Sequence, residues 1–260
     1  MEQRVISFES GDIGLKGQVY IPYSPDLQPA PALCLCHGIP GGGPPDPSDP
    51  GYPTLARRFS QAGFLTVIFN FRGTGASEGN FDIAGWTKDL VAALDYLCNM
   101  SEVDRGRISI MGFSAGAAVS VRVASQDSRI SSLITCACPA QFLFAADHHS
   151  AESTIAQFRH IGIIKDESFP PSVSNWMASF KKVKPIEWID KISPRPLLII
   201  HGTQDDVVDP MSARALYERA GEPKEIMLIE GAGHRLRLVE QAMDGAMNWL
   251  TARVSPLFRD

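Results

Sequence analysis

The sequence has no long apolar segment of the kind that crosses a membrane or directs export. A membrane-spanning helix needs about 20 consecutive apolar residues, and no stretch of the chain approaches that length. The first residues, Met1 to Ile6, are polar and lack the apolar core of a signal peptide. We therefore expect a cytoplasmic location and no membrane partner.

The sequence also contains fewer basic than acidic residues. The 24 Lys and Arg residues are outnumbered by 29 Asp and Glu residues, so the formal net charge is -5. The densest basic patch consists of Lys181, Lys182 and Lys184, and it fits a solvated helix end. An acidic chain without a larger basic cluster argues against nucleic acid as a partner.

Cysteine is infrequent and odd in number, and the usual cofactor motifs are absent. Four of the five cysteines lie in short apolar runs, where a free thiol behaves as a small hydrophobic group: Cys34, Cys36, Cys136 and Cys138. An odd number of thiols in such settings predicts a reducing compartment. The sequence also has no zinc-ligand spacing, dinucleotide fingerprint or phosphate-binding loop, so we expect neither a metal nor a cofactor.

The chain instead contains a regular alternation of apolar strands and amphipathic helices. Its 260 residues, 44% of them hydrophobic, suit one domain over residues 1–260. The alternation predicts an α/β fold, with a mostly parallel twisted sheet covered by helices on both faces. The expected elements are an antiparallel hairpin (3–9 and 15–21), strands 32–36, 65–69, 107–112, 130–136, 196–201 and 224–229, and helices 53–62, 84–99, 115–125, 211–220 and 236–253.

The segment from about 140 to 190 breaks this alternation and is rich in aromatic residues. Trp176 and Phe180 are one helical turn apart and would share a helix face, and Phe142 comes earlier in the same segment. So many aromatic side chains outside the sheet predict a small helical cap, in which Phe142, Trp176 and Phe180 line an apolar substrate pocket. The alternative is an extra pair of helices that packs on the core and adds only stability.

The run Gly112-Phe113-Ser114-Ala115-Gly116 indicates a nucleophile. It follows an apolar β-branched run and precedes a small-residue helix pattern, so Ser114 would stand on a tight strand-to-helix turn. Such a turn needs positions nearly free of side chains two residues before and two after the serine, and Gly112 and Gly116 meet that need. The helix that follows would direct its free N–H groups at negative charge beside Ser114.

Three further polar segments come directly after predicted strands. Because the carboxyl ends of parallel strands meet at one edge of a sheet, these segments would gather near the serine. A serine hydroxyl is a poor nucleophile until a positioned base such as histidine takes its proton. The segments are His37-Gly38-Ile39-Pro40-Gly41-Gly42-Gly43, His201-Gly202-Thr203-Gln204-Asp205-Asp206 and Gly231-Ala232-Gly233-His234.

The order and contexts of these segments resemble the α/β-hydrolase superfamily over nearly the whole chain. The match includes the glycine-flanked serine, the His-Gly turn, the His-Gly-x-x-Asp segment, the Gly-x-Gly-His ending and an Arg-Gly-x-Gly-x-Ser loop over residues 72–77. The chain is most similar to small esterases and to the catalytic domains of acyl-peptide hydrolases and dipeptidyl peptidases. The resemblance implies the α/β-hydrolase fold and a serine hydrolase.

The resemblance also assigns catalytic roles. Ser114 would be the nucleophile, His234 the base, and Asp205 the carboxylate that orients the histidine ring. Asp206 and Asp209 are alternatives for the carboxylate, although near a strand end they could instead cap the helix that follows.

The oxyanion of the reaction would be bound by two backbone N–H groups. The first is that of Ala115, directly after the nucleophile. The resemblance places the second at Ile39, whereas the glycine run favours Gly41 or Gly42.

These parts support acyl transfer to water, and we expect a small-molecule carboxylic ester with an apolar or aromatic acyl group. A small peptidase or amidase is the alternative, since acidic groups in the insertion could bind a substrate ammonium; a thioesterase is a further one. A binding module on an inactive scaffold is disfavoured because no member of the triad is missing. The acidic residues of the insertion that could bind a substrate ammonium are Asp147, Glu152, Asp166 and Glu167.

Nothing in the pattern sets an oligomeric state.

Overall fold

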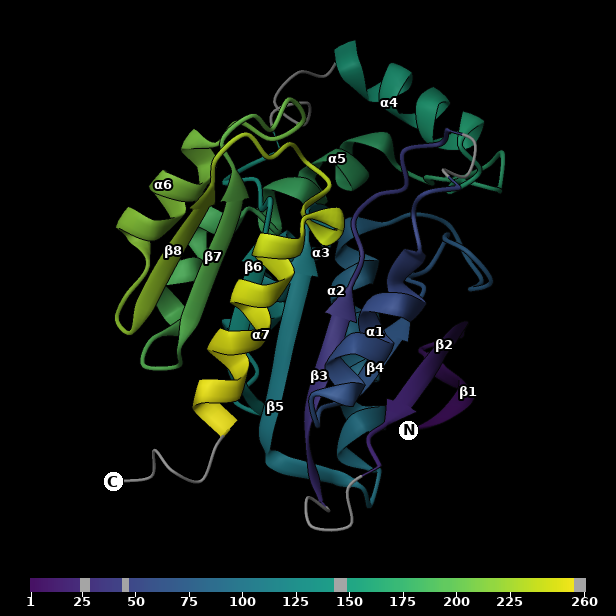
Figure 1. Ribbon diagram of the computed structural model, residues 1–260. Helices are drawn as coiled ribbons and strands as arrows, with labels where there is room; N and C mark the ends of the chain where they lie inside the picture. The colour runs from purple at the N-terminus through teal and green to yellow at the C-terminus, as the bar shows by residue number, and fades with distance from the viewer. Residues whose placement is uncertain (24–28, 44–46, 143–148, 255–260) are drawn as a thin grey trace.

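The computed structural model describes residues 1–23, 29–43, 47–142 and 149–254 (Figure 1). Its centre is one eight-stranded sheet with the order β1-β2-β4-β3-β5-β6-β7-β8. β1 and β2 pair antiparallel, β2 pairs antiparallel with β4, and all other neighbours are parallel. The strands are β1 (Glu2–Ser10), β2 (Ile13–Ile21), β3 (Ala30–Cys36), β4 (Leu65–Phe69), β5 (Val103–Phe113), β6 (Ile130–Cys136), β7 (Leu197–Gly202) and β8 (Lys224–Ile229).

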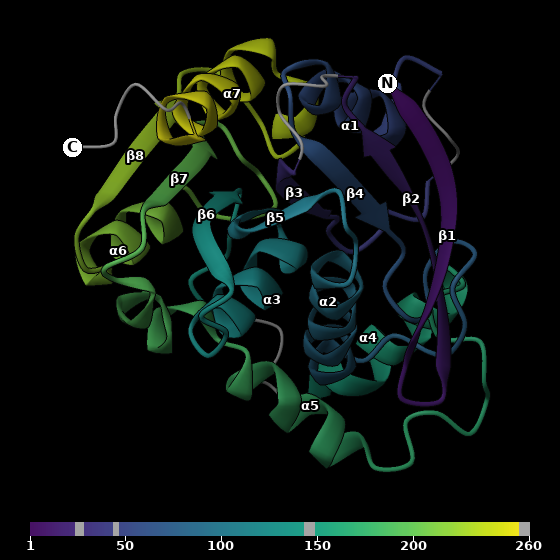
Figure 2. The same cartoon turned by 90° about the horizontal axis from the view of Figure 1, so that it is seen from below.

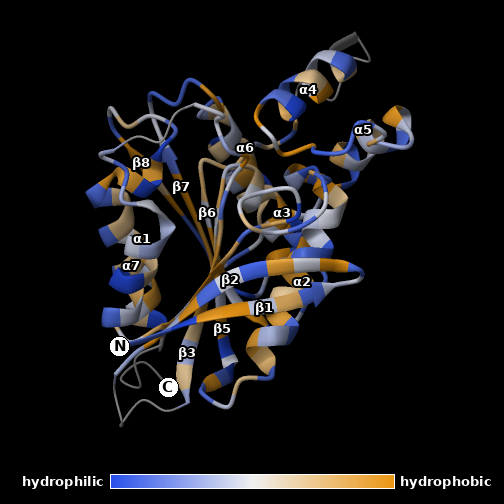
Figure 3. Ribbon diagram, turned by 90° about the vertical axis from the view of Figure 1, so that its right-hand side faces the viewer, coloured by the Kyte–Doolittle hydropathy of each residue, from blue (hydrophilic) through white to orange (hydrophobic). Residues whose placement is uncertain are grey.

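Helices cover both faces of this sheet, as the alternation of the sequence predicts. With the sheet seen close to edge-on, α1 and α7 lie on one face, and α2, α3 and α6 lie on the other (Figure 3). This arrangement, an α/β-hydrolase fold, confirms the predicted fold class. The helices are α1 (Gly51–Gln61), α2 (Ile83–Cys98), α3 (Ala115–Ala124), α6 (Met211–Arg219) and α7 (Glu240–Val254).

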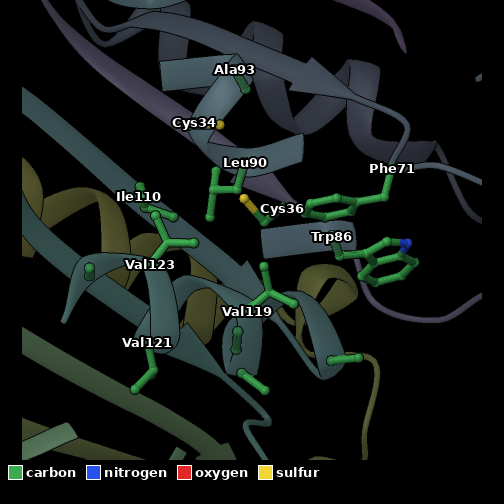
Figure 4. Close-up of a cluster of buried hydrophobic side chains, with 14 of the residues drawn as sticks. Cys34, Cys36, Phe71, Trp86, Leu90, Ala93, Ile110, Val119, Val121 and Val123 are labelled. Carbon is green, nitrogen blue, oxygen red and sulfur yellow. The ribbon is translucent and has the colours of Figure 1, made fainter. Parts of the chain in front are cut away.

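Each face of the sheet has its own hydrophobic core. The larger core lies under α2, α3 and α6, and the smaller one lies under α1 and α7. Cys34 and Cys36 of β3 pack in the larger core beside Leu90 of α2 and Val119 of α3 (Figure 4). All five cysteines are free thiols, and four of them are buried. The thiols therefore act as small core side chains.

Most predicted elements are observed within a few residues of their predicted limits. The predicted helix over 236–253 is wrong at its start, where the chain forms a 3-10 turn, η5 (Leu236–Leu238), before α7 begins at Glu240. Val239 between them is extended, with φ -97° and ψ 110°, and its carbonyl accepts the N–H groups of Ala242 and Met243 in the first turn of α7. The extended backbone of Val239 interrupts the helical path, so the 3-10 turn and α7 are separate elements.

The aromatic insertion forms helices above the carboxyl ends of the strands and beside α2 (Figures 1 and 2). Backbone and side-chain hydrogen bonds attach it to the loop before α2. Phe81 N–H donates to the Ile163 carbonyl at 2.7 Å, and the N–H groups of Lys165 and Asp166 donate to the Asn80 side chain at 2.7 and 2.9 Å. The insertion contains α4 (His149–His160), α5 (Val173–Lys182) and the turns η3 (Pro185–Glu187) and η4 (Ile189–Ile192).

None of the helices in the described ranges is both long enough and apolar enough to span a bilayer.

Candidate active site

Ser114 stands alone between the end of β5 and the start of α3, in a strained backbone conformation. Its φ of 52° and ψ of -123° lie in a region that residues with a side chain rarely adopt. A Cβ at Gly112 would lie 2.5 Å from the Ala117 Cα, and one at Gly116 would lie 2.6 Å from the Cys36 carbonyl oxygen. The turn can therefore close only with glycine at both positions.

The loop after β3 lies directly against the serine. A Cβ at Gly38 would be 2.9 Å from the Ser114 Cβ and 3.5 Å from its Oγ. Among the described residues, the N–H groups of Ala115 and Ile39 have no hydrogen-bond acceptor. Two backbone donors are thus unused beside the serine. Gly42, further along the loop, instead packs against Ile161 at the end of α4.

His234 and Asp205 are hydrogen-bonded to each other across the ends of β8 and β7. The His234 Nδ1 lies 3.0 and 2.9 Å from the two carboxylate oxygens. Asp205 has a fully buried side chain, and its Oδ1 also accepts the Val207 and Val208 N–H groups at 2.9 and 2.8 Å. The carboxylate is therefore held by several donors and can orient the ring of His234.

The other two aspartates of this segment are placed differently. Asp206 is exposed. Asp209 accepts the Met211 N–H at 2.8 Å, in the manner of a residue that caps the start of α6. Of the three candidate carboxylates, only Asp205 is paired with His234 in the part of the chain that the structure describes.

The three aromatic residues predicted for the pocket lie in one cluster with unequal exposure. Trp176 and Phe180 are 4% and 1% exposed, and their ring centroids are 5.1 Å apart. The Trp176 indole N–H donates to the Phe81 carbonyl at 3.2 Å. Phe142 is only half-buried and packs on Phe180 at 5.4 Å. The cluster thus joins the insertion to the core, with Phe142 at its more exposed end.

His37 shapes the loop that carries Ile39. Its Nε2 accepts the Phe71 N–H at 3.2 Å, so Nδ1 carries the proton and donates to the Gly38 carbonyl at 2.7 Å. Burial lowers the pKa of His37, which keeps the ring neutral. The histidine therefore ties the loop after β3 to the loop after β4.

Two ion pairs near the site have partners that the sequence pattern does not reveal. Asp89, fully buried in α2, pairs with Arg72 at 2.7 Å. Asp49 pairs with Arg237, whose guanidinium lies over the ring of Tyr52 at 4.7 Å. The hydrogen bond from Arg237 lowers the pKa of Asp49 to about 2. Partners as far apart as Asp49 and Arg237 leave no local signal in the sequence.

No group of three or more His, Cys, Asp and Glu side chains within the described ranges is arranged to hold a metal ion.

A comparison with protein families identifies the relatives of this site. The model of the prolyl oligopeptidase family matches residues 53–252. The chain belongs to this family. The match places it in the α/β-hydrolase superfamily of serine hydrolases, as its motifs indicate.

Two curated relatives show how much of such proteins the chain covers. It is 30% identical over 173 residues to the uncharacterized protein YfhR of Escherichia coli K12, a match over 66% of this chain and 53% of that protein. The chain therefore spans about half the length of this relative. It is 24% identical over 220 residues to the polyketide transferase ATR5 of Stachybotrys chlorohalonatus, covering 68% of this chain and 73% of the relative.

Solved structures share the fold at low sequence identity. The α/β hydrolase GrgF from Penicillium sp. sh18 matches with a TM-score of 0.74 and 18% identity, over 97% of this chain and 99% of that one. Est1E from Butyrivibrio proteoclasticus, in a structure with bound ferulic acid, matches with a TM-score of 0.70 and 20% identity, over 95% and 99% of the two chains.

Proposed function

We propose that this protein is a serine hydrolase that cleaves carboxylic esters through an acyl-enzyme on Ser114. The observation that carries the proposal is the strained Ser114 beside two unused N–H donors, in a chain whose Asp205 holds His234. Strained backbone of this kind persists only where the surrounding structure holds it, and it concentrates at functional sites.

The proposed reaction divides into acylation and deacylation. His234 accepts the Ser114 proton at Nε2 while the serine oxygen attacks the carbonyl carbon, and Asp205 stabilises the imidazolium through Nδ1–H. The Ala115 and Ile39 N–H groups bind the oxyanion. His234 then gives its proton to the departing alcohol. Water, activated by the same histidine, hydrolyses the acyl-enzyme and restores Ser114.

Several features support an ester with an apolar or aromatic acyl group. Half-buried apolar side chains are available on the β3 loop (Ile39), on the insertion where it meets Gly42 (Ile161) and in the aromatic cluster (Phe142). Within the proposal, the aromatic cluster of Phe142, Trp176 and Phe180 forms the wall of the acyl pocket. Est1E, whose fold is similar, is a protein solved with ferulic acid bound, and ferulic acid is an aromatic acid.

Peptide or amide cleavage is the second candidate. The matching family is named for a peptidase. Exposed acidic side chains of the insertion, Glu152, Asp166 and Glu167, could bind a substrate ammonium. Asp147, the fourth acidic residue of the prediction, lies outside the described residues. Thioester cleavage uses the same acyl-enzyme and is tested by the same panel of substrates.

The test is a substrate panel with a matched serine control. p-Nitrophenyl esters of increasing chain length, feruloyl esters, acyl thioesters and aminoacyl anilides are compared for kcat/KM. Ser114→Ala should lower kcat by about a millionfold, whereas Ser125→Ala at the end of α3 should leave it unchanged. A fluorophosphonate probe should label the wild type and not the Ser114 variant. Cleavage of anilides without ester cleavage would reverse the ranking, and labelling that survives Ser114→Ala would refute the nucleophile.

A further inference from the structure

The carboxylate of Asp205 is contacted by a second histidine. His201, at the end of β7, is completely buried, and its Nε2 lies 3.2 Å from Asp205 Oδ2 and 3.0 Å from the Val208 carbonyl oxygen. The proposed mechanism does not use this residue. Its Nδ1 is also buried and has no hydrogen-bond partner among the described residues.

The protonation of His201 follows from its partners. A carbonyl oxygen can only accept, so the hydrogen bond to Val208 requires a proton on Nε2. Burial lowers the pKa of His201, which favours the neutral ring, and a neutral ring with Nε2–H has no proton on Nδ1. The Nε2–H therefore donates to the Val208 carbonyl, and the same nitrogen contacts Asp205 Oδ2 at 3.2 Å.

The unpartnered Nδ1 argues against a purely structural role. A buried acceptor without a donor is costly, whereas an apolar side chain of similar volume at this position would avoid that cost. Histidine contributes here, and leucine would not, a donor that bonds the Val208 carbonyl and contacts Asp205 Oδ2.

We propose that His201 is a positioning residue for the hydrolytic reaction: its Nε2–H holds Asp205 Oδ2, so that the carboxylate keeps the orientation in which it binds His234. The inference rests on the proposed function. The Val207 and Val208 N–H groups already hold Oδ1, so His201 supplies the corresponding donor at Oδ2.

The donor also limits how strongly Asp205 attracts the proton of His234. A carboxylate that loses a hydrogen-bond donor becomes more basic and favours the imidazolium form of its partner. Removal of the His201 donor should therefore move the acid limb of the pH profile to higher pH. The charges that act on His201 are those of Asp205 and His234. On the neighbouring β6, burial raises the pKa of the Cys136 thiol, which therefore stays uncharged.

The test compares His201→Leu, which removes the donor, with His201→Gln, whose amide nitrogen can occupy the position of Nε2. We expect His201→Leu to lower kcat at pH 7 by about tenfold, far less than the roughly 10⁴-fold loss typical of the orienting aspartate itself. Its acid limb of kcat/KM should move upward by about half a pH unit or more, with KM nearly unchanged. His201→Gln should restore the rate and the profile.

Two results would overturn the proposal. One is a pH profile of His201→Leu that matches the wild type while thermal stability falls, which would assign the residue to packing. The other is a loss in His201→Gln equal to that in His201→Leu.

A measurement on the wild-type protein keeps the proposal testable if a variant does not fold or if the proposed ester activity is absent. In protein labelled with 15N-histidine, the NMR signals of His201 should report Nε2–H with unprotonated Nδ1 from pH 5 to 9. A neutral ring with its proton on Nδ1 and none on Nε2 would exclude the donor to Asp205 whatever the activity. Loss of hydrolysis in every protein tested, with the expected tautomer observed, would instead count against the proposed function alone.

Discussion

The loops around Ser114 and the cap above them are stabilised by different interactions. In the loops, buried polar groups satisfy one another: Asp205 accepts from His234 and two backbone N–H groups, and His37 ties two loops together. In the insertion, aromatic rings pack on one another and on the core, as Trp176 does on Phe158 of α4 and on Phe81. Directional hydrogen bonds fix atoms for chemistry, whereas apolar packing fixes a surface and tolerates changes of shape.

The two regions meet at the hydrogen bonds of Asn80 and Phe81 with the insertion and at a close contact of Gly42 with Ile161. Gly42 of the β3 loop, with φ +68°, is so close to Ile161 that an added Cβ would overlap its side chain. The loop that carries a proposed oxyanion donor therefore supports the cap. A change at Gly42 or Ile161 should therefore affect both regions.

The largest effect is expected within the polar loops. Asp205→Asn should lower kcat by about 10⁴-fold, because an amide no longer holds His234 in the required tautomer. Asp206→Asn, one residue later and exposed, is the control and should behave as the wild type. Steady-state kinetics with a short p-nitrophenyl ester measures both. A larger loss in the Asp206 variant would mean that the carboxylate is assigned to the wrong residue.

Substitutions in the insertion should affect the free energy of unfolding more than the catalytic rate. Trp176→Ala should lower the free energy of unfolding by about 3–5 kcal/mol, since it empties a buried aromatic site. Val173→Ala on the same helix, 39% exposed, should change it little. Urea unfolding gives these values. If Trp176 also lines the acyl pocket, its variant should retain the rate for an acetyl ester and change the preference for longer chains; an unchanged KM and preference would assign it to packing alone.

A single added methyl group at Gly42 should disrupt its contact with Ile161. Gly42→Ala should destabilise the protein by about 1–3 kcal/mol, through positive φ and overlap with Ile161. The double variant with Ile161→Ala removes the overlap and leaves the φ strain. A double-mutant cycle on unfolding free energies and on kcat/KM measures the coupling. Strict additivity would show that the two residues do not interact.

The smallest effect is expected from the ion pair between Asp49 and Arg237. Asp49→Asn should lower the unfolding free energy by about 1 kcal/mol at pH 7, the upper range for such a partly exposed pair. Because the folded pKa of Asp49 is about 2, below its usual 3.8, the stabilisation is present above pH 4 and is lost as the pH falls through 2. The difference between variant and wild type should narrow over that range. Asp244→Asn, in a more exposed pair with Arg58, is the control.

The sequence alone supports the fold class, most element boundaries and the identity of the proposed catalytic residues. These rest on local patterns: strand and helix periodicity, glycines around Ser114, and polar residues directly after strands. Topology then brings the strand ends together, because parallel strands present their carboxyl ends on one edge. The pairing of Asp205 with His234 follows this logic, since each residue comes shortly after a neighbouring strand.

Only the tertiary structure decided the partners that are remote in sequence or have no pattern of their own. Asp49 and Arg237, Arg72 and Asp89, and the contact of His201 with Asp205 Oδ2 depend on side-chain distances that no periodicity encodes. The same holds for the burial of Trp176, which the pattern fits equally well to a pocket wall or to core packing. Hydrogen bonds and close packing depend on sub-ångström geometry, and that geometry is set when the whole chain has folded.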